Sequence, residues 1–248
     1  MTRTSRRWQS KPGSFDTLHA QQLFPSGNSY GIPNLRHTSV ERIPAWLVPY
    51  RQRIRVDEAL DDGAVHFFLD DYRFETVWNR PVKALAALAP YQTVLTPDFS
   101  LYRDWPLLLQ LWNTYRNRWC VRFWQEQGFT VFPTISWSTA VSYDFCFLGV
   151  PRRGVVAVAT VGVDMKRPLE YQLFVDGFRE MVRQLEPLVV LAYGRLPAAC
   201  HELVEVITYP TRWTNIRAAR RTGEIRIRGA EVEGSPPSLY PNQKEEYL

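Results

Sequence analysis

The sequence is poor in the residues that build disulfide frameworks and metal clusters. Its 248 residues include three cysteines and four histidines, and neither set has a spacing typical of zinc, iron or redox sites. Cys120, Cys146 and Cys200 are odd in number and far apart, which argues against a secreted disulfide scaffold. We therefore expect a cytoplasmic protein whose thiols are reduced.

Long apolar runs are also missing. The longest largely apolar run, 155–163, is far shorter than the roughly 20 residues that a membrane-spanning helix needs. Residues 1–14 carry charges but lack the apolar core of a signal peptide. These absences predict a soluble, unsecreted protein with no membrane partner.

Core-forming residues and positive charge are plentiful. Hydrophobic residues make up 45% of the chain and aromatic residues 14%, including nine Trp and thirteen Phe, so one sizeable domain can form a core. The formal net charge of +5 favours polyanions through the release of their counterions. Nucleic acid is therefore a partner that the charge allows but does not require.

Short apolar runs alternate with helical patterns along the chain. Helices are expected at 81–90, 105–128, 138–149 and 170–187, and strands at 64–69, 92–95, 130–135, 155–161 and 188–193. Most of these strands are continuously apolar, as is typical of strands covered on both faces. The alternation predicts an α/β core at 41–207 with a mostly parallel sheet of five or six strands, either an open three-layer sheet or a partial barrel.

The two ends of the chain differ from this core. Residues 1–40 are polar and rich in Ser, Gly and Pro, which predicts a flexible N-terminal segment. Residues 208–248 form an extension whose first part is basic and whose end is acidic. Its arginines could contact phosphates or belong to an ordinary solvated surface. They are Arg212, Arg217, Arg220, Arg221, Arg226 and Arg228.

The helix expected at 105–128 has the clearest pattern. Asp104 is the expected N-cap and Gly128 the expected residue of the C-terminal turn. Arg116 and Arg118 border the apolar stripe and are expected on a solvated flank, while Arg122 falls inside the stripe and should either pair or extend to solvent. The stripe consists of Leu108, Leu111, Trp112, Tyr115, Trp119 and Phe123.

Polar side chains follow each of the expected strands. In parallel α/β folds, ligands bind beyond the carboxyl ends of the strands, because loops and helix N-termini meet there. The same residue types also serve as caps and turn residues in strand-to-helix loops. The side chains expected at this edge are Asp70, Asp71, Asp98, Ser100, Trp137, Ser138, Asp164 and Arg195.

The carboxylates at this edge suit two kinds of chemistry. Asp98, with Asp70 or Asp71, could bind Mg²⁺ or Mn²⁺ through oxygen ligands, or one carboxylate could act as a general base while another stays charged. The proline-aspartate pair at Asp98, with Asp164 and Lys166, is similar to the signature of metal-dependent nucleases, although the long connection between its two parts departs from that signature. The pattern favours a metal-assisted enzyme acting on a phosphate-bearing substrate, either a nucleotide or a nucleic acid.

Four further residues at this edge are candidate substrate ligands: Ser100, Trp137, Ser138 and Arg195. Trp137 could stack on a base or sugar, or pack in the core. Ser138 could bind substrate or cap a helix. The alternative function is that of a non-catalytic nucleic-acid-binding accessory protein, which uses the arginine-rich C-terminal segment for its contacts.

Several strings in the chain resemble a known family. "YGIPNLR", "HFFLDDYRFETVWNRP", "VLTPDFSLYRDWP" and "FCFLGVPRRGVVAVATVG" are similar to a domain-of-unknown-function family (4417) of bacterial, phage and mobile-element proteins. The resemblance runs from about Tyr30 to Gly194, and its most specific parts are PDFS and WS. It implies a phage or mobile-element setting but no activity or catalytic residue, and the C-terminal arginines lie outside it.

Overall fold

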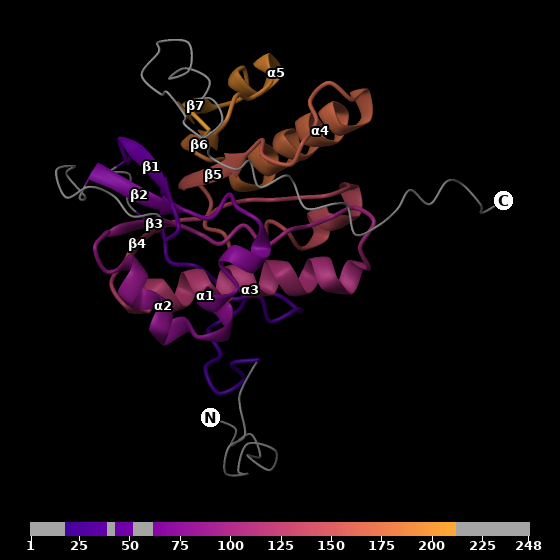
Figure 1. Cartoon of the computed structure of the whole chain (residues 1–248). Coiled ribbons are helices and arrows are strands. Elements are labelled where there is room, and N and C mark those ends of the chain that lie inside the picture. The colour runs from indigo at the N-terminus through magenta and orange to yellow at the C-terminus, as the bar shows by residue number, and fades with distance from the viewer. Residues whose placement is uncertain (1–17, 39–42, 52–61, 212–248) are drawn as a thin grey trace, which may run out of the picture. The chain divides into compact units, whose positions relative to one another are not determined.

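The computed structural model describes residues 18–38, 43–51 and 62–211, in which strands and helices alternate (Figure 1). The strands are β1 (Trp46–Pro49), β2 (Gly63–His66), β3 (Thr93–Leu95), β4 (Thr130–Phe132), β5 (Val155–Ala159), β6 (Val189–Tyr193) and β7 (Glu205–Tyr209). The α-helices are α1 (Thr76–Asn79), α2 (Pro81–Leu88), α3 (Leu107–Glu126), α4 (Pro168–Leu185) and α5 (Ala198–His201). Two short 3₁₀ helices, η2 (Asp71–Arg73) and η3 (Ala140–Asp144), lie in the loops.

Every pairing between the described strands is parallel. β1, β2, β3 and β4 form one sheet in chain order, and β5, β6 and β7 form a second. Thr134, just beyond β4, forms a parallel bridge with Ala157 of β5, so the second sheet continues from the first. The α/β fold with a parallel sheet is therefore confirmed, with seven strands described. β1 carries a weak sequence signal, because it is mostly half-buried and ends in proline.

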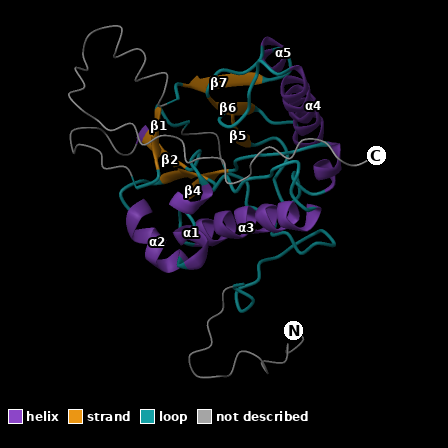
Figure 2. Ribbon diagram, turned by 45° about the vertical axis from the view of Figure 1, so that its right-hand side comes forward, coloured by secondary structure: helices purple, strands orange, loops and turns teal. Residues whose placement is uncertain are grey.

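Successive residues of each strand face two different cores. The outward residues of the first sheet pack with α1, α2 and α3, and those of the second sheet pack with α4 and α5, as the separation of the helices in Figure 2 shows. The inward residues of both sheets share one cluster, which includes Ala64, Leu95, Phe132, Ala157 and Leu191. Since β1 to β7 follow one another in order, a shared inner core is the arrangement of a partial barrel.

Contacts across the inner core link distant strands. His66 and Phe68, at the end of β2, contact the Tyr193 ring of β6 at centroid distances of 4.4 and 5.0 Å. At the end of β7, the Tyr209 hydroxyl donates a 2.6 Å hydrogen bond to the Pro44 carbonyl, just before β1. These contacts connect the last strand to the approach of the first.

The start of α3 corrects one expectation. Asp104 is not the N-cap, because the helix begins at Leu107 after Pro106 and no side chain caps it. Gly128 has a φ of 88°, which confirms its place in the turn after the helix. The helix expected at 138–149 is only the short 3₁₀ helix η3.

Part of the polar N-terminal segment lies on the core. Within 18–38, Ile32 and Leu35 are buried. The Gln125 side chain of α3 accepts a hydrogen bond from the Arg36 amide at 2.8 Å and donates one to the Arg36 carbonyl at 2.9 Å. Residues 1–17 and 39–40 of the expected flexible segment lie outside the described residues, as do residues 212–248 with all six C-terminal arginines. Within the described ranges, no helix has the length and apolar character to span a membrane.

His66 is a polar group inside the inner core. The residue is 1% exposed, and its Nδ1 accepts a 3.2 Å hydrogen bond from the Phe68 amide. The other ring nitrogen, Nε2, has no hydrogen-bond partner among the described residues. Burial lowers the pKa of His66 to about 3, because the charged imidazolium would lose its hydration.

We expect the His66→Phe variant to lose less unfolding free energy than wild type when the pH is lowered. The pKa of His66 is about 3 in the folded state and near the ordinary value of 6.5 in the unfolded state. Between pH 6.5 and pH 3, the His66 ring is therefore protonated in the unfolded state but not in the folded state. Wild-type stability should therefore fall as the pH decreases through this range, by up to about 1.4 kcal/mol per pH unit from this group.

Urea unfolding of both chains at pH 7 and pH 4.5 measures this difference, with His201→Phe on the exposed end of α5 as the control. The account of His66 is contradicted if His66→Phe and wild type lose equal stability between the two pH values.

Candidate active site

Asp98 lies beyond the carboxyl end of β3 and is half-buried. It accepts a short hydrogen bond on Oδ1 from the hydroxyl of Ser136, which follows β4. β3 and β4 are parallel neighbours, so both residues are at the same edge of the sheet. Burial raises the pKa of Asp98 to about 6; the Ser136 hydrogen bond opposes this rise, and the charge of Asp71 adds to it.

Asp71, the first residue of η2 after β2, is a second carboxylate at this edge. It accepts hydrogen bonds from the Ser100 hydroxyl at 2.9 Å and the Ser100 amide at 3.1 Å. Burial raises the pKa of Asp71, while Ser100 and the charge of Arg116 act in the opposite direction. Asp71 and Asp98 therefore form a carboxylate pair at this edge, in which the charge of Asp71 disfavours ionisation of Asp98.

Two asparagines of α3 hold the loop between these groups. Asn113 donates a 2.7 Å hydrogen bond to the Ser100 carbonyl. Asn117, one turn later, donates to the Pro97 carbonyl at 2.6 Å and to Thr96 Oγ1 at 3.2 Å. Both ends of the loop that carries Asp98 are thus bound to one face of the helix.

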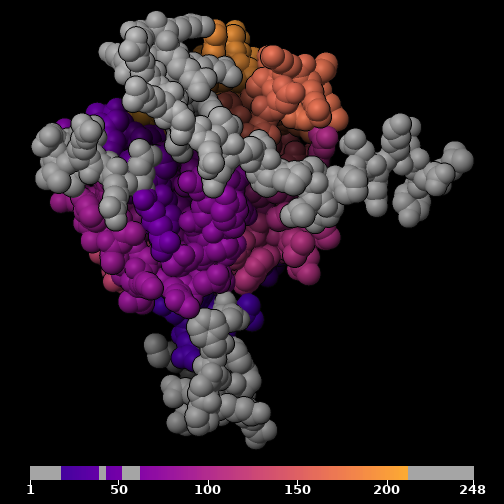
Figure 3. Space-filling view, in the orientation of Figure 1, coloured from indigo at the N-terminus to yellow at the C-terminus, as the bar shows by residue number. Residues whose placement is uncertain are grey.

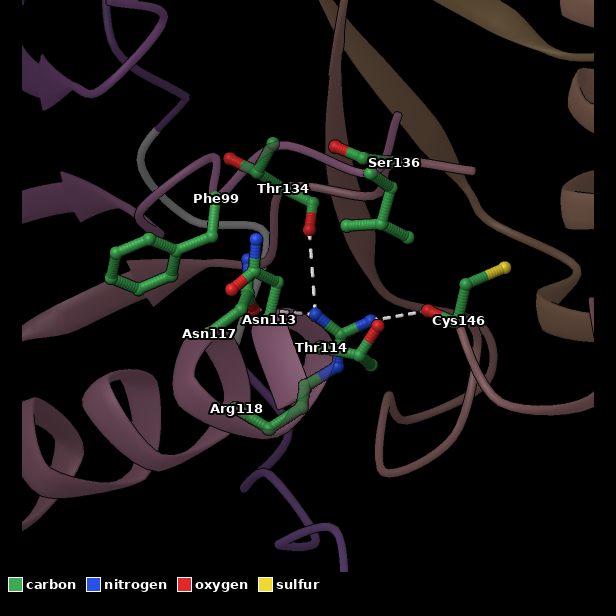
Figure 4. Close-up of a pocket in the computed structure, with 9 residues that line it drawn as sticks. Phe99, Asn113, Thr114, Asn117, Arg118, Thr134, Ser136 and Cys146 are labelled. Atoms are coloured by element: carbon green, nitrogen blue, oxygen red, sulfur yellow. Dashed lines mark hydrogen bonds between the residues drawn. The ribbon is translucent and has the colours of Figure 1, made fainter. Parts of the chain in front are cut away.

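Arg118 extends this buried polar face of α3 to a second loop (Figure 4). The residue is 2% exposed; Nη1 donates to Asn117 Oδ1 at 2.5 Å, Nη2 to the Cys146 carbonyl at 2.6 Å, and Nε to the Leu148 carbonyl at 3.1 Å. It forms no ion pair with the residues that the structure describes. Burial without a carboxylate partner lowers the pKa of Arg118 to about 10.

The expectation that Arg116 and Arg118 lie on a solvated flank is wrong. Arg116 is 9% exposed, pairs with Glu75 at 2.9 Å, and donates to Asn113 Oδ1 at 2.7 Å. Its guanidinium carbon lies 3.9 Å from the centroid of the Phe99 ring. Both arginines are buried because they bind loops that fold over the helix, which periodicity within the helix cannot reveal. Arg122, inside the apolar stripe, pairs with Glu126 at 2.8 Å.

A small cavity lies between α3 and the loops beyond the strands (Figure 4). Asn113, Asn117 and Arg118 line it from the helix, with Ser136 and Leu101 among the residues on the loop side. Its volume is about 10 Å³, which is room for about one water molecule. A nucleotide therefore does not fit inside this cavity.

The other expected carboxylates, Asp70 and Asp164, have different surroundings. Asp70 is exposed, and Asp164 accepts a 3.1 Å hydrogen bond from the Lys166 amide and pairs with Arg167 at 3.4 Å. These contacts make Asp164 part of the turn that leads into α4. Among the described residues, no group of three or more His, Cys, Asp or Glu is arranged to hold a metal ion.

The remaining candidates have differing surroundings. Trp137 donates to the Leu173 carbonyl at 3.2 Å and packs on Phe174, so α4 occupies much of its ring. Ser138 is buried and donates to Gln110 Oε1 at 2.5 Å. Arg195, two residues beyond β6, is exposed. Ser100 lies in the site, where it binds Asp71.

Sequence reasoning missed three residues that shape the site, Asn113, Asn117 and Ser136, and expected a fourth, Arg118, on a solvated flank. The available signal was the pair of asparagines at i and i+4 in the middle of a long, otherwise core-forming helix. Such a pair is typical of side chains that bind main-chain groups of a neighbouring loop.

The same range that forms this fold also matches a family model. Residues 24–210 match the family described as Domain of unknown function (DUF4417). The chain belongs to this family. The DUF4417 range contains every described strand, from β1 to β7. The expected resemblance is therefore confirmed, and it extends beyond both Tyr30 and Gly194.

Two relatives of this DUF4417 chain come from bacteriophages. The Gene 1 protein of Mycobacterium phage D29 is 41% identical over 249 residues, which cover 99% of this chain and 88% of the relative. The Gene 1 protein of Mycobacterium phage L5 is 42% identical over 219 residues, which cover 87% of this chain and 94% of the relative. No solved structure matches the chain.

We expect Asp98→Asn to stabilise the protein at pH 8 and to lose this advantage in acid. The pKa of Asp98 is raised to about 6, so above pH 6 the native state carries a poorly hydrated charge, whereas the same charge is well hydrated in the unfolded state. As the pH falls through 6 towards 4, Asp98 takes up its proton and this penalty disappears. The expected gain at pH 8 is on the order of 1–2 kcal/mol, reduced by the partial exposure of Asp98.

Urea unfolding at pH 8 and pH 4.5 measures the gain, with exposed Asp70→Asn as the control. Equal stability of Asp98→Asn and wild type at pH 8 would show that burial does not disfavour the Asp98 carboxylate.

Proposed function

We propose that this protein is an enzyme in which Asp98 transfers a proton during the conversion of a phosphate-bearing substrate, either a nucleotide or a nucleic acid. The observation that carries the proposal is Asp98 itself, half-buried at the carboxyl edge of the sheet, with a pKa of about 6. A general acid or base works best when its pKa is near the working pH. Asp71 and Asp98 have different hydrogen-bond environments, as is common for carboxylate pairs that divide acid and base roles.

Exposed arginines at the same edge support the choice of a phosphate-bearing substrate. Arg73, Arg103 and Arg195 follow β2, β3 and β6, and all three are exposed. None of them forms an ion pair with the described part of the chain. Guanidinium groups bind phosphate oxygens through paired N–H donors, so these arginines are available for substrate.

Mg²⁺ or Mn²⁺ is the cofactor that we propose for this reaction. With the cation bound, Asp98 would be its main ligand, with Asp70 or Asp71 as a second. A cation keeps its ligand carboxylate ionised, so Asp98 would then position the cation and substrate, and the proton-transfer role applies to the cation-free form of the reaction. Mg²⁺ is commonly bound by one or two carboxylates together with water and substrate phosphates, and does not require an all-protein cage. The proposal includes no role for Asp164 and Lys166, because their contacts are those of the turn before α4.

We expect Asp98→Asn to abolish turnover while the protein remains folded. Loss of a general acid or base typically lowers the rate about 10²- to 10⁴-fold, and the wild-type pH profile should include a group that titrates near pH 6. The measurement is cleavage of nucleotides and of single- and double-stranded nucleic acid, with and without Mg²⁺ or Mn²⁺.

Asp62→Asn, at an exposed acid just before β2, is the control for a general effect of charge and should keep most of the activity. If Asp98 binds the cation, Mn²⁺ should raise the melting temperature of wild type but not of Asp98→Asn. Turnover that survives Asp98→Asn contradicts the proposed function.

A second candidate function rests on the charge of the C-terminal segment. Residues 212–228 contain six arginines and one acid, Glu224, a composition that suits contact with nucleic-acid phosphates. In this alternative the core is a scaffold and the protein is a non-catalytic nucleic-acid-binding accessory protein.

We expect replacement of these six arginines by glutamine to weaken binding of duplex DNA or RNA and to flatten its dependence on log salt. Each phosphate that is no longer neutralised should reduce the slope by about 0.9 for a duplex. We choose substitution because deleting the whole extension from residue 208 would also remove the end of β7. That strand extends to Tyr209, whose hydroxyl binds the Pro44 carbonyl. An unchanged salt slope removes this candidate.

A further inference from the structure

Two tyrosine-arginine pairs lie beside the candidate site. Tyr72 and Arg73 belong to η2 after β2, and Tyr102 and Arg103 follow the loop after β3. Tyr72 is 75% exposed and Tyr102 is 55% exposed, and both arginines are exposed as well. Neither ring is part of the core, so both are open to a ligand.

The hydrogen bonds of the site bring the two pairs together. Asp71, the residue before Tyr72, accepts hydrogen bonds from both the amide and the hydroxyl of Ser100, at 3.1 and 2.9 Å. Ser100 is two residues before Tyr102, so the two segments run from one shared contact. They belong to the first sheet and its connections, which form the purple and magenta part of the face in Figure 3.

One of the two rings has a fixed neighbour. The Tyr102 ring packs edge-on against Trp105, at a centroid distance of 4.9 Å, and the Trp105 amide donates a 3.1 Å hydrogen bond to the Tyr102 carbonyl. This turn holds the ring in place while more than half of the residue remains open to solvent. A ring held in this way loses little side-chain entropy when a ligand stacks on it.

We propose that Tyr72 and Tyr102 stack on bases of a single-stranded nucleic acid whose phosphates contact Arg73 and Arg103. In the reaction proposed for Asp98, the substrate would then be a single-stranded nucleic acid. This assignment of the substrate rests on the proposed function, whereas the binding of the strand itself does not. Aromatic rings and arginines in alternation are typical of single-strand binding, because every base has a face for stacking. A duplex keeps those faces stacked inside the helix.

The charges near the rings predict how this binding responds to salt. Arg73 and Arg103 are accompanied by the exposed acids Asp70 and Asp104, so the surface has little net charge. Stacking should therefore provide most of the affinity, and two arginines should contribute a slope of no more than about −1.4 against log salt for a single strand. Binding through the C-terminal arginines would depend on salt more steeply and would not require bases.

The test measures binding by full-length Asp98→Asn protein, so that turnover does not consume the probe. The probes are a fluorescent oligothymidylate of about ten nucleotides and an abasic strand of the same length and charge. We expect the oligothymidylate to bind more tightly, and Tyr72→Ala or Tyr102→Ala to weaken its binding about 5- to 150-fold with an unchanged salt slope. Binding of the abasic strand should not change.

Matched variants separate stacking from other causes. Tyr72→Phe and Tyr102→Phe keep the ring and should retain binding, whereas Tyr30→Ala removes a ring that is 49% exposed elsewhere on the chain and should have no effect. Equal affinity for the two probes, or alanine variants that bind oligothymidylate as the parent does, would overturn the proposal. If the protein binds oligothymidylate more tightly than the abasic strand but wild type shows no turnover, the binding proposal is supported and only the proposed reaction is rejected.

Discussion

Hydrogen bonds from one buried face of α3 to the main chain of two loops hold the candidate site in place. Beyond the ends of parallel strands, backbone groups have no strand neighbours and need other partners when they are buried. Asn113 and Asn117 satisfy carbonyls of the loop that carries Asp98, and Arg118 satisfies carbonyls of the loop after η3. Each buried carbonyl left without a partner would cost about 1–3 kcal/mol. A movement of either loop away from α3 would therefore be unfavourable by at least this amount.

The fixed loop explains why Asp98 remains in an unfavourable environment. Its carboxylate is half-buried near that of Asp71, with one hydrogen bond from Ser136. A free loop would turn the carboxylate towards water and relieve this penalty. Groups whose pKa values are shifted at a sheet edge are common in functional sites, where stability is lower than the fold could achieve. The exposed rings of Tyr72 and Tyr102 next to this pair are unfavourable in the same sense.

The sequence predicts the strands of this fold better than the details of its site. Apolar runs identify β2 to β6 because most of their residues are buried on both faces, while β1 is mostly only half-buried and ends in proline. The carboxyl edge follows from parallel pairing, and Asp71 and Ser100, both expected there, are joined by a hydrogen bond. Asp164 belongs to a turn before α4, which periodicity does not distinguish from a ligand position. The roles of Asn117 and Arg118 depend on loops folding over α3 from distant parts of the chain, and no local pattern contains that information.

If Asp98 is the proton-transfer group that we propose, its carboxyl group has to titrate near pH 6 in the folded chain. Carbon-13 NMR of the Asp98 carboxyl carbon, followed through a pH titration of the full chain, measures this titration. The account predicts a midpoint near pH 6, which rises further in Ser136→Ala because the serine hydrogen bond favours the charged form. A midpoint near the ordinary aspartate value of about 3.9, unchanged by Ser136→Ala, would contradict it.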